Sequence, residues 1–132
     1  MKKIDISGSP FEIGLRLGEL GREAWHQKLI LTSLWQTVMT LQASPETRIM
    51  RAEVQRHYPH IWQELEGLAQ GLEATVDQVF AWNCRGDLVR STSDGCTTVA
   101  GVNAAGERII AHNEDGFPQL RNECLDRKST RL

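Results

Sequence analysis

Hydrophobic residues recur at helical spacing up to about residue 90, and capping signals mark where the helices begin. In the stretch SPFE, Ser9 can cap a helix, Pro10 suits its first position and Glu12 completes a capping box. We therefore expect a helix from about Pro10 to Leu41, with room for a break along it. Three small residues share one face of this helix and would let another backbone come close: Gly14, Gly18 and Gly21.

Two further helices are predicted between residues 44 and 72. SPET starts one of them, with Ser44 as its cap and Pro45 as its first residue, and it should end near Tyr58 because Pro59 disfavours a helical residue before it. The next stretch, HIWQELEGLAQGL, has apolar residues at helical spacing: Ile61, Leu65, Leu68 and Leu72. A second small-residue patch falls within it: Gly67 and Gly71.

The pattern changes from helical to β-rich after a last helix. TVDQ is another capping box, with Thr75 as cap and Gln78 three residues on, and predicts a helix to about Leu88 or Val89. STSDG and NAAG are turn clusters, and CTTVAGV and ERIIAHN are apolar strand-like runs, so we expect a β-hairpin whose first strand begins at Cys96. KKIDI, residues 2–6, alternates and predicts a short strand. The fold class is therefore α+β.

Composition and charge exclude several classes of protein. The 132 residues are 40% hydrophobic and 24% charged, as in one globular domain. With 15 basic and 17 acidic residues, the chain has no electrostatic footprint for nucleic acid or an anionic membrane. It has neither a secretory signal nor a run of apolar residues long enough to span a bilayer. We expect a cytoplasmic protein that binds neither nucleic acid nor membrane.

The cysteines, histidines and tryptophans give no sign of a cofactor or metal. Three cysteines are an odd number and suit reduced thiols better than a disulfide framework. His57 and His60 have a helical ligand spacing, but Pro59 lies between them and no cysteine or carboxylate cluster accompanies them, which favours a surface pair. The four tryptophans are expected in the core or an interface: Trp25, Trp35, Trp62 and Trp82.

Candidate chemistry lies where the predicted hairpin begins. The Cys96 thiol directly follows Gly95, whose carbonyl has no side chain to shield it, so an N-to-S acyl shift followed by hydrolysis would cut the chain between the two residues. The product would begin with a cysteine whose own α-amine, with a pKa of roughly 7.7 to 8.0, can take the thiol proton. The alternative is that Cys96 is a buried, unreactive thiol, which is the commonest state of a free cysteine.

The predicted return strand ends in AHNEDG and would bring polar side chains back toward Cys96. Asp115 could orient the amine, and Asn113 or a backbone N–H could support the site. His112 is a further polar candidate for substrate or site support.

DGCTT, followed 16 to 19 residues later by HNED, resembles the processing site and first strand pair of the acyl-coenzyme A:6-aminopenicillanic acid (isopenicillin-N) acyltransferases. These are autoproteolytic cysteine peptidases among the N-terminal nucleophile hydrolases. SPFEIGLRLGELG and the ELEGLAQG run, Glu64 to Gly71, are similar to the family's helical propeptide, so the resemblance covers about residues 8 to 123.

The resemblance implies a four-layer αββα fold, of which this chain would be an N-terminal part. Residues 1–95 would be a helical propeptide and 96–125 the start of the catalytic chain, so that the mature form is a heterodimer of its own cleaved chains. The resemblance assigns the nucleophile to Cys96, its positioning to Asp115 and a place in the same motif to Asn113. His112 stands where relatives have arginine or glutamine, which leaves its role open.

Residues 126–132, DRKSTRL, look like a translated sequencing adapter and are expected to be a non-native tail. The family's later oxyanion-hole asparagine and most of its two sheets have no counterpart among these residues, so the 132-residue chain itself is expected to be inactive. The implied activity is hydrolysis or transfer at amide bonds of small acylated molecules or peptides, without a cofactor.

Two other interpretations stay open. One is a non-catalytic helical interaction module in which Cys96 is structural. The other is a conventional cysteine peptidase with a Cys96–His112 pair, which would be active without chain cleavage.

Overall fold

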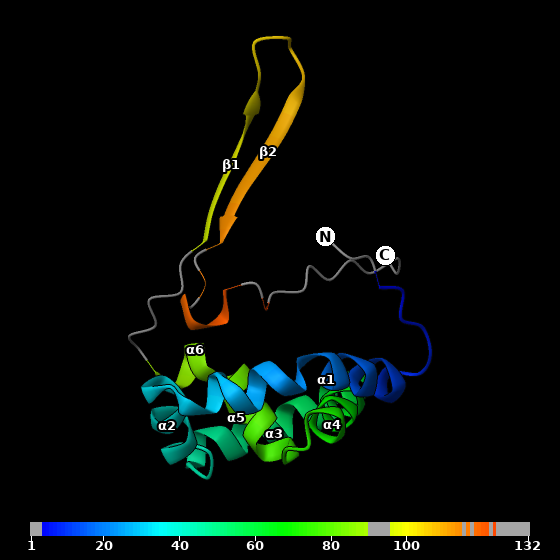
Figure 1. Ribbon diagram of the computed structural model, residues 1–132, viewed down its shortest axis with the longest axis vertical. Helices are drawn as coiled ribbons and strands as arrows, with labels where there is room; N and C mark the ends of the chain where they lie inside the picture. The colour runs from blue at the N-terminus through cyan, green and yellow to red at the C-terminus, as the bar shows by residue number, and fades with distance from the viewer. Residues whose placement is uncertain (1–3, 90–95, 115, 117, 122, 124–132) are drawn as a thin grey trace. The chain divides into compact units, whose positions relative to one another are not determined.

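The computed structural model describes residues 4–89, 96–114, 116, 118–121 and 123 (Figure 1). The chain divides into two compact units, Met1–Ser91 and Thr92–Leu132. The first unit is helical and the second contains a β-hairpin, so the fold mixes helices with a small two-stranded antiparallel sheet. None of the helices in the described part of the chain is long and apolar enough to cross a membrane.

The helical unit follows the predicted order, with two breaks. Its elements are α1 (Pro10–Gln27), η1 (Leu29–Leu31), α2 (Ser33–Thr40), α3 (Pro45–His57), α4 (Pro59–Leu72), α5 (Val76–Asn83) and α6 (Arg85–Leu88). The capping boxes predicted at Ser9 and Thr75 are both present, and the Ser44 side chain caps α3. The predicted helix starts are therefore confirmed.

The breaks have local causes. The helix expected from Pro10 to Leu41 is interrupted because the Thr32 hydroxyl accepts a hydrogen bond from the Trp35 N–H at 3.1 Å and so caps a new helix. The last predicted helix divides at Cys84, which ends α5 and precedes α6. Of the strand predicted over residues 2–6, the described residues 4–6 belong to no strand, so that prediction is wrong there. A strand needs a pairing partner, and the two strands of the hairpin pair with each other.

Helices α1 and α4 cross in direct backbone contact at the two predicted small-residue patches (Figure 1). A Cβ atom added to Gly14 would lie 2.8 Å from the Leu68 nitrogen, and one added to Gly67 would lie 2.8 Å from the carbonyl carbon of Phe11. Carbonyl oxygens of the facing helix lie closer still. Only glycine fits here, because any side chain would have to push the two helices apart.

Aromatic rings fill the space beside this crossing. The rings of Trp25 and Trp35 meet edge to face at 4.7 Å between centroids, and the Trp82 ring lies 5.7 Å from that of Trp35. A second pair is formed by Trp62 and Phe80, whose ring centroids lie 5.6 Å apart. The buried apolar residues are Trp25, Leu29, Trp35, Val38, Trp62, Ala69, Leu72, Val79, Phe80 and Ala81. The expectation that the tryptophans belong to a core is confirmed for three of them, and Trp82 is half-buried against the same cluster.

Polar side chains of α1 bind the C-terminal end of α4. The Arg22 Nε donates to the Gly71 carbonyl at 2.8 Å, and the His26 Nε2 lies 2.7 Å from the Leu72 oxygen. These contacts satisfy carbonyls that have no partner within the helix. Glu73 follows in the left-handed conformation, with φ 56°, and forms an ion pair with Arg22 at 2.7 Å.

The second unit contains β1 (Cys96–Val102), β2 (Arg108–Glu114) and a short turn of helix, η2 (Pro118–Leu120). The strands pair antiparallel around a tight turn over residues 103–107. The Asn103 Oδ1 accepts hydrogen bonds from the backbone N–H groups of Ala105 and Glu107, at 2.9 and 3.0 Å, and Gly106 takes a φ of 82°. The predicted hairpin, its turn at NAAG and its start at Cys96 are confirmed.

Candidate functional site

The register of the hairpin determines which candidate residues meet. Cys96 is the first residue of β1 and pairs with Glu114, the last residue of β2. Thr97 pairs with Asn113, and Thr98 pairs with His112. The HNE end of the second strand therefore returns beside the first three residues of β1, and Asn113 lies opposite the neighbour of Cys96 rather than opposite Cys96 itself.

His112 is held by a cross-strand hydrogen bond. Its Nδ1 lies 2.8 Å from the Thr98 Oγ1, and the pair is exposed to solvent. Either group can donate, depending on the tautomer of the ring. The bond leaves Nε2 as the second polar atom of the ring.

Asn113 and His112 belong to opposite faces of the hairpin. Successive side chains of a strand alternate between its two faces, while directly paired residues share one. Thr98 and His112 therefore share a face, and Thr97 and Asn113 share the other. If both candidates act in one site, they must reach it from different sides of the sheet.

Two predicted site residues lie outside the described part of the chain. These are Gly95, on the amino side of the predicted cleavage point, and Asp115, which directly follows β2. For Cys96 the structure gives the backbone and its pairing. The arrangement of the Cys96 and Asp115 side chains about the Gly95 carbonyl is therefore a prediction.

Apolar residues are exposed on both faces of the hairpin. Val102 and Ile110 lie on one face and are 67% and 77% exposed, while Val99 and Ile109 lie on the other and are 62% and 47% exposed. A sheet with one solvated face alternates between apolar and polar residues, whereas a sheet covered on both faces has apolar residues on each. The hairpin sequence is thus of the kind that is covered on both sides.

The remaining cysteine and histidine candidates have ordinary surroundings. Cys84 is a half-buried free thiol, and burial, with a smaller contribution from the Asp87 charge, raises its pKa. The His57 Nε2 lies 3.2 Å from a Glu53 carboxylate oxygen, and His60 is exposed, so both predicted surface histidines lie on the surface. Within the described ranges, no three histidine, cysteine or acidic side chains gather as a metal site would require.

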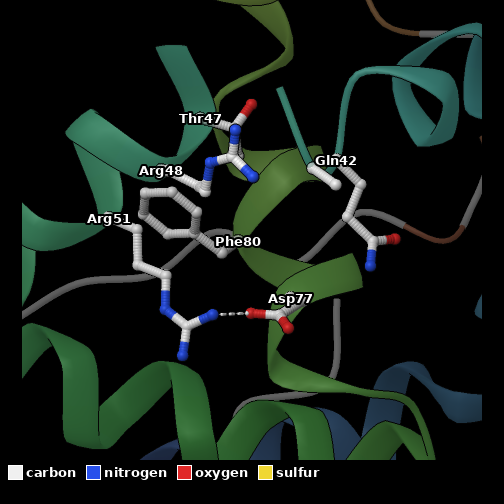
Figure 2. A pocket seen from close by; sticks show the side chains of 7 residues that line it. Gln42, Thr47, Arg48, Arg51, Asp77 and Phe80 are labelled. Carbon is white, nitrogen blue, oxygen red and sulfur yellow. Dashed lines mark hydrogen bonds and ion pairs between the residues drawn. The ribbon is translucent and has the colours of Figure 1, made fainter. Parts of the chain in front are cut away.

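Sequence reasoning missed a charged cavity in the helical unit (Figure 2). It lies between the loop after α2, helix α3 and helix α5, and its volume is about 160 Å³. Arg51 of α3 forms an ion pair with Asp77 of α5 at 2.5 Å, and its guanidinium lies 5.2 Å from the centre of the Trp62 ring. No short motif marks this cavity, because Arg51 and Asp77, which form its ion pair, are 26 positions apart in the chain.

Comparisons of the chain with protein-family models, with curated proteins and with solved structures found no match.

Proposed function

We propose that the chain carries the processing site of an autocatalytic cysteine N-terminal nucleophile hydrolase or acyltransferase, cleaved between Gly95 and Cys96. The helical unit would be the propeptide, and the hairpin would begin the catalytic chain of a larger αββα fold. Small acylated molecules or peptides would be its substrates, at their amide bonds. This activity would belong to the protein with its further strands in place.

The observation that carries the proposal is the hairpin register. Cys96 is the first residue of its strand, and the strand that returns beside it ends in the HNED motif. An N-terminal nucleophile needs polar groups close to its amine and to the developing oxyanion. By the register, His112 lies two residue pairs from Cys96 on the same face of the hairpin, and Asn113 lies one pair away on the other face.

The apolar residues on the two faces of the hairpin support the proposed architecture. In an αββα fold each sheet lies between a helical layer and the second sheet, so its strands are covered on both faces. Val99 and Ile110, on opposite faces and 62% and 77% exposed, are suited to such a double covering. A hairpin that stays exposed at the surface of a folded protein would be expected to carry fewer large apolar side chains.

The self-cleavage step would proceed through a thioester. The Cys96 sulfur attacks the carbonyl carbon of Gly95, the Gly95–Cys96 C–N bond breaks, and the Cys96 nitrogen takes up a proton as it becomes an amine. Water then attacks the thioester, which releases a Gly95 carboxylate and restores the Cys96 thiol. The peptide bond is hydrolysed overall, and no oxidant or cofactor is needed.

The new α-amine would then serve as the base for substrate turnover. It takes the thiol proton, the thiolate attacks a substrate amide carbonyl, and the protonated amine supplies a proton to the leaving nitrogen. Water or an acceptor amine resolves the resulting acyl-cysteine. In this scheme Asp115 orients the amine, and Asn113 or a backbone N–H supports the site. His112, fixed through Nδ1 by Thr98, presents Nε2 to the substrate.

Intact-mass spectrometry of the protein expressed from its complete reading frame tests the proposal. We expect two chains whose masses correspond to scission before Cys96, and a single uncut chain for Cys96→Ala. Cys84→Ala is the matched control, since it also removes one thiol but should leave scission unchanged.

Two outcomes would favour the other interpretations. An uncut wild-type chain without activity would support a helical interaction module with a structural Cys96. An uncut chain with activity that is lost in His112→Ala would support a conventional Cys96–His112 peptidase. Either result would overturn the proposal.

A further inference from the structure

The cavity beside α3 is lined by a charged side chain, that of Arg48, that forms no ion pair within the described helical unit. The Arg51 guanidinium already has two partners, because its Nη1 binds the Asp77 carboxylate and the group lies over the Trp62 ring. Arg48 lies one helical turn earlier on α3, is exposed and lines the same cavity. In the described part of the chain, no carboxylate lies within ion-pair distance of Arg48.

Glu46 interacts electrostatically with Arg48 but does not line the cavity. Hydrogen bonding with the Glu46 backbone and the Ser44 side chain, with a smaller contribution from the Arg48 charge, holds the Glu46 pKa below its usual range. The cavity walls themselves therefore carry two guanidinium groups against the single carboxylate of Asp77.

The walls of the cavity are held in place by contacts of their own. The Thr47 hydroxyl donates to the Leu41 carbonyl at 2.8 Å, which fixes the loop before α3. The Arg51–Asp77 ion pair ties α3 to α5 on the opposite side. Preformed walls lower the ordering cost of binding a ligand.

The size and lining of the cavity limit what it can hold. A volume of about 160 Å³ is close to that of an engineered cavity of roughly 150 Å³ that takes up one benzene molecule. The Phe80 ring forms an apolar part of the wall, and Figure 2 shows it between the side chains of Arg48 and Arg51. The Gln42 amide adds a neutral polar group.

We propose that this cavity binds a small monocarboxylate with an apolar, ring-sized body, whose carboxylate meets the Arg48 guanidinium and whose body lies against Phe80. Arginine recognises carboxylates through paired, charge-assisted hydrogen bonds. Asp77 limits the site to a single negative charge, because a second one would face its carboxylate. The site belongs to the helical unit, and the proposal does not depend on the function proposed for Cys96.

Titration of the isotope-labelled chain with sodium benzoate, at constant ionic strength and followed by NMR, tests this site. We expect saturable amide shifts confined to residues around the cavity, in the loop after α2, in α3 and in α5. Acetate, which lacks the ring, and benzamide, which lacks the charge, should each bind at least about tenfold more weakly.

Matched arginine variants on α3 locate the carboxylate contact. Arg48→Ala should raise the Kd of benzoate about tenfold or more, since it removes a charged hydrogen-bond donor. Arg56→Ala removes an exposed arginine of α3 that does not line the cavity and should change the Kd less than about twofold.

Several results would overturn the proposal. These are the absence of saturable shifts, equal affinity for benzoate and benzamide, equal affinity for benzoate and acetate, or the same change of Kd in Arg48→Ala and Arg56→Ala. The two arginine substitutions are at exposed positions, and far-ultraviolet circular dichroism will show whether each variant keeps the helical content of the wild type.

Discussion

Gly18 of α1 and Gly71 of α4 face each other so closely that a Cβ atom built on either would lie 2.8 Å from the Cα of the other. Real Cβ atoms essentially never approach another atom so closely. The two helices therefore touch through their backbones at this point. A methyl group on either residue requires the helices to separate.

Glycine-to-alanine substitutions in α1 should distinguish the effect of packing on stability from the effect of helix propensity. Gly18→Ala should lower the free energy of unfolding by about 1 to 3 kcal/mol or more, because overpacking outweighs the propensity gain. Gly21→Ala is the matched control on the same helix: its Cβ would lie 3.6 Å from the Leu72 Cδ2, an ordinary contact. It should leave stability unchanged or raise it by up to about 1 kcal/mol. Urea unfolding followed by circular dichroism measures both, and equal stability of the two variants would refute the backbone contact.

The buried hydroxyl of Thr47 should contribute to stability through one hydrogen bond. Thr47 is 3% exposed, and its Oγ1 donates to the Leu41 carbonyl at 2.8 Å. Thr47→Val keeps the shape but removes one of the two donors to this carbonyl, since the Ser44 N–H also donates to it at 3.0 Å, so we expect a loss of about 0.5 to 1.5 kcal/mol. Thr40→Val removes an exposed hydroxyl that donates to the Thr37 carbonyl at 2.7 Å, and water can replace it. The two variants should therefore differ in their urea midpoints, and indistinguishable midpoints would contradict the assignment.

The first helix should lose stability in acid through Glu12. Backbone and side-chain hydrogen bonds from Ser9 hold the Glu12 pKa below its ordinary value. A carboxyl with a depressed folded-state pKa stabilises the fold above its unfolded-state pKa, and this contribution disappears as the pH falls through the folded-state value. An NMR titration of the Glu12 carboxyl measures the pKa directly. Ser9→Ala should move that pKa back toward its ordinary value, and a Glu12 that titrates normally in the wild type would disprove the effect.

The Cys84 thiol should react slowly in the folded chain. Burial and the Asp87 charge both raise its pKa, so less of it is thiolate at neutral pH. We expect iodoacetamide to alkylate Cys84 more slowly in buffer than in urea, as followed by peptide mass spectrometry, and Asp87→Asn to speed the reaction in buffer. Equal rates in buffer and in urea would show that the thiol is not shielded.

Local sequence signals predicted the starts of the helices and the hairpin because those features depend on neighbouring residues. The capping boxes at Ser9 and Thr75 and the glycine turn at Gly106 each involve side chains within a few positions. The small-residue patches also predicted a close backbone approach. The sequence alone did not show that the patch at Gly14 meets the one at Gly67, since partner choice is a matter of tertiary packing.

The features that the sequence did not predict depend on competition between local signals or on tertiary packing. The break at Thr32 arises because a local cap competes with a continuous helical pattern, and periodicity alone does not decide between them. The cavity beside α3 depends on Arg51 and Asp77, which only the packing of α3 against α5 brings together. At the candidate site, the turn at NAAG predicted that the two strands pair. The Thr98–His112 hydrogen bond was not predicted, because it depends on the exact register of that pairing.

In the proposed function, the bond between Gly95 and Cys96 cleaves itself. N-terminal sequencing of the protein, purified after expression from its complete reading frame, detects this cleavage. We expect a second chain that begins Cys-Thr-Thr-Val and is absent in Cys96→Ala. A single uncut chain, or a new N-terminus at any other residue, would contradict it.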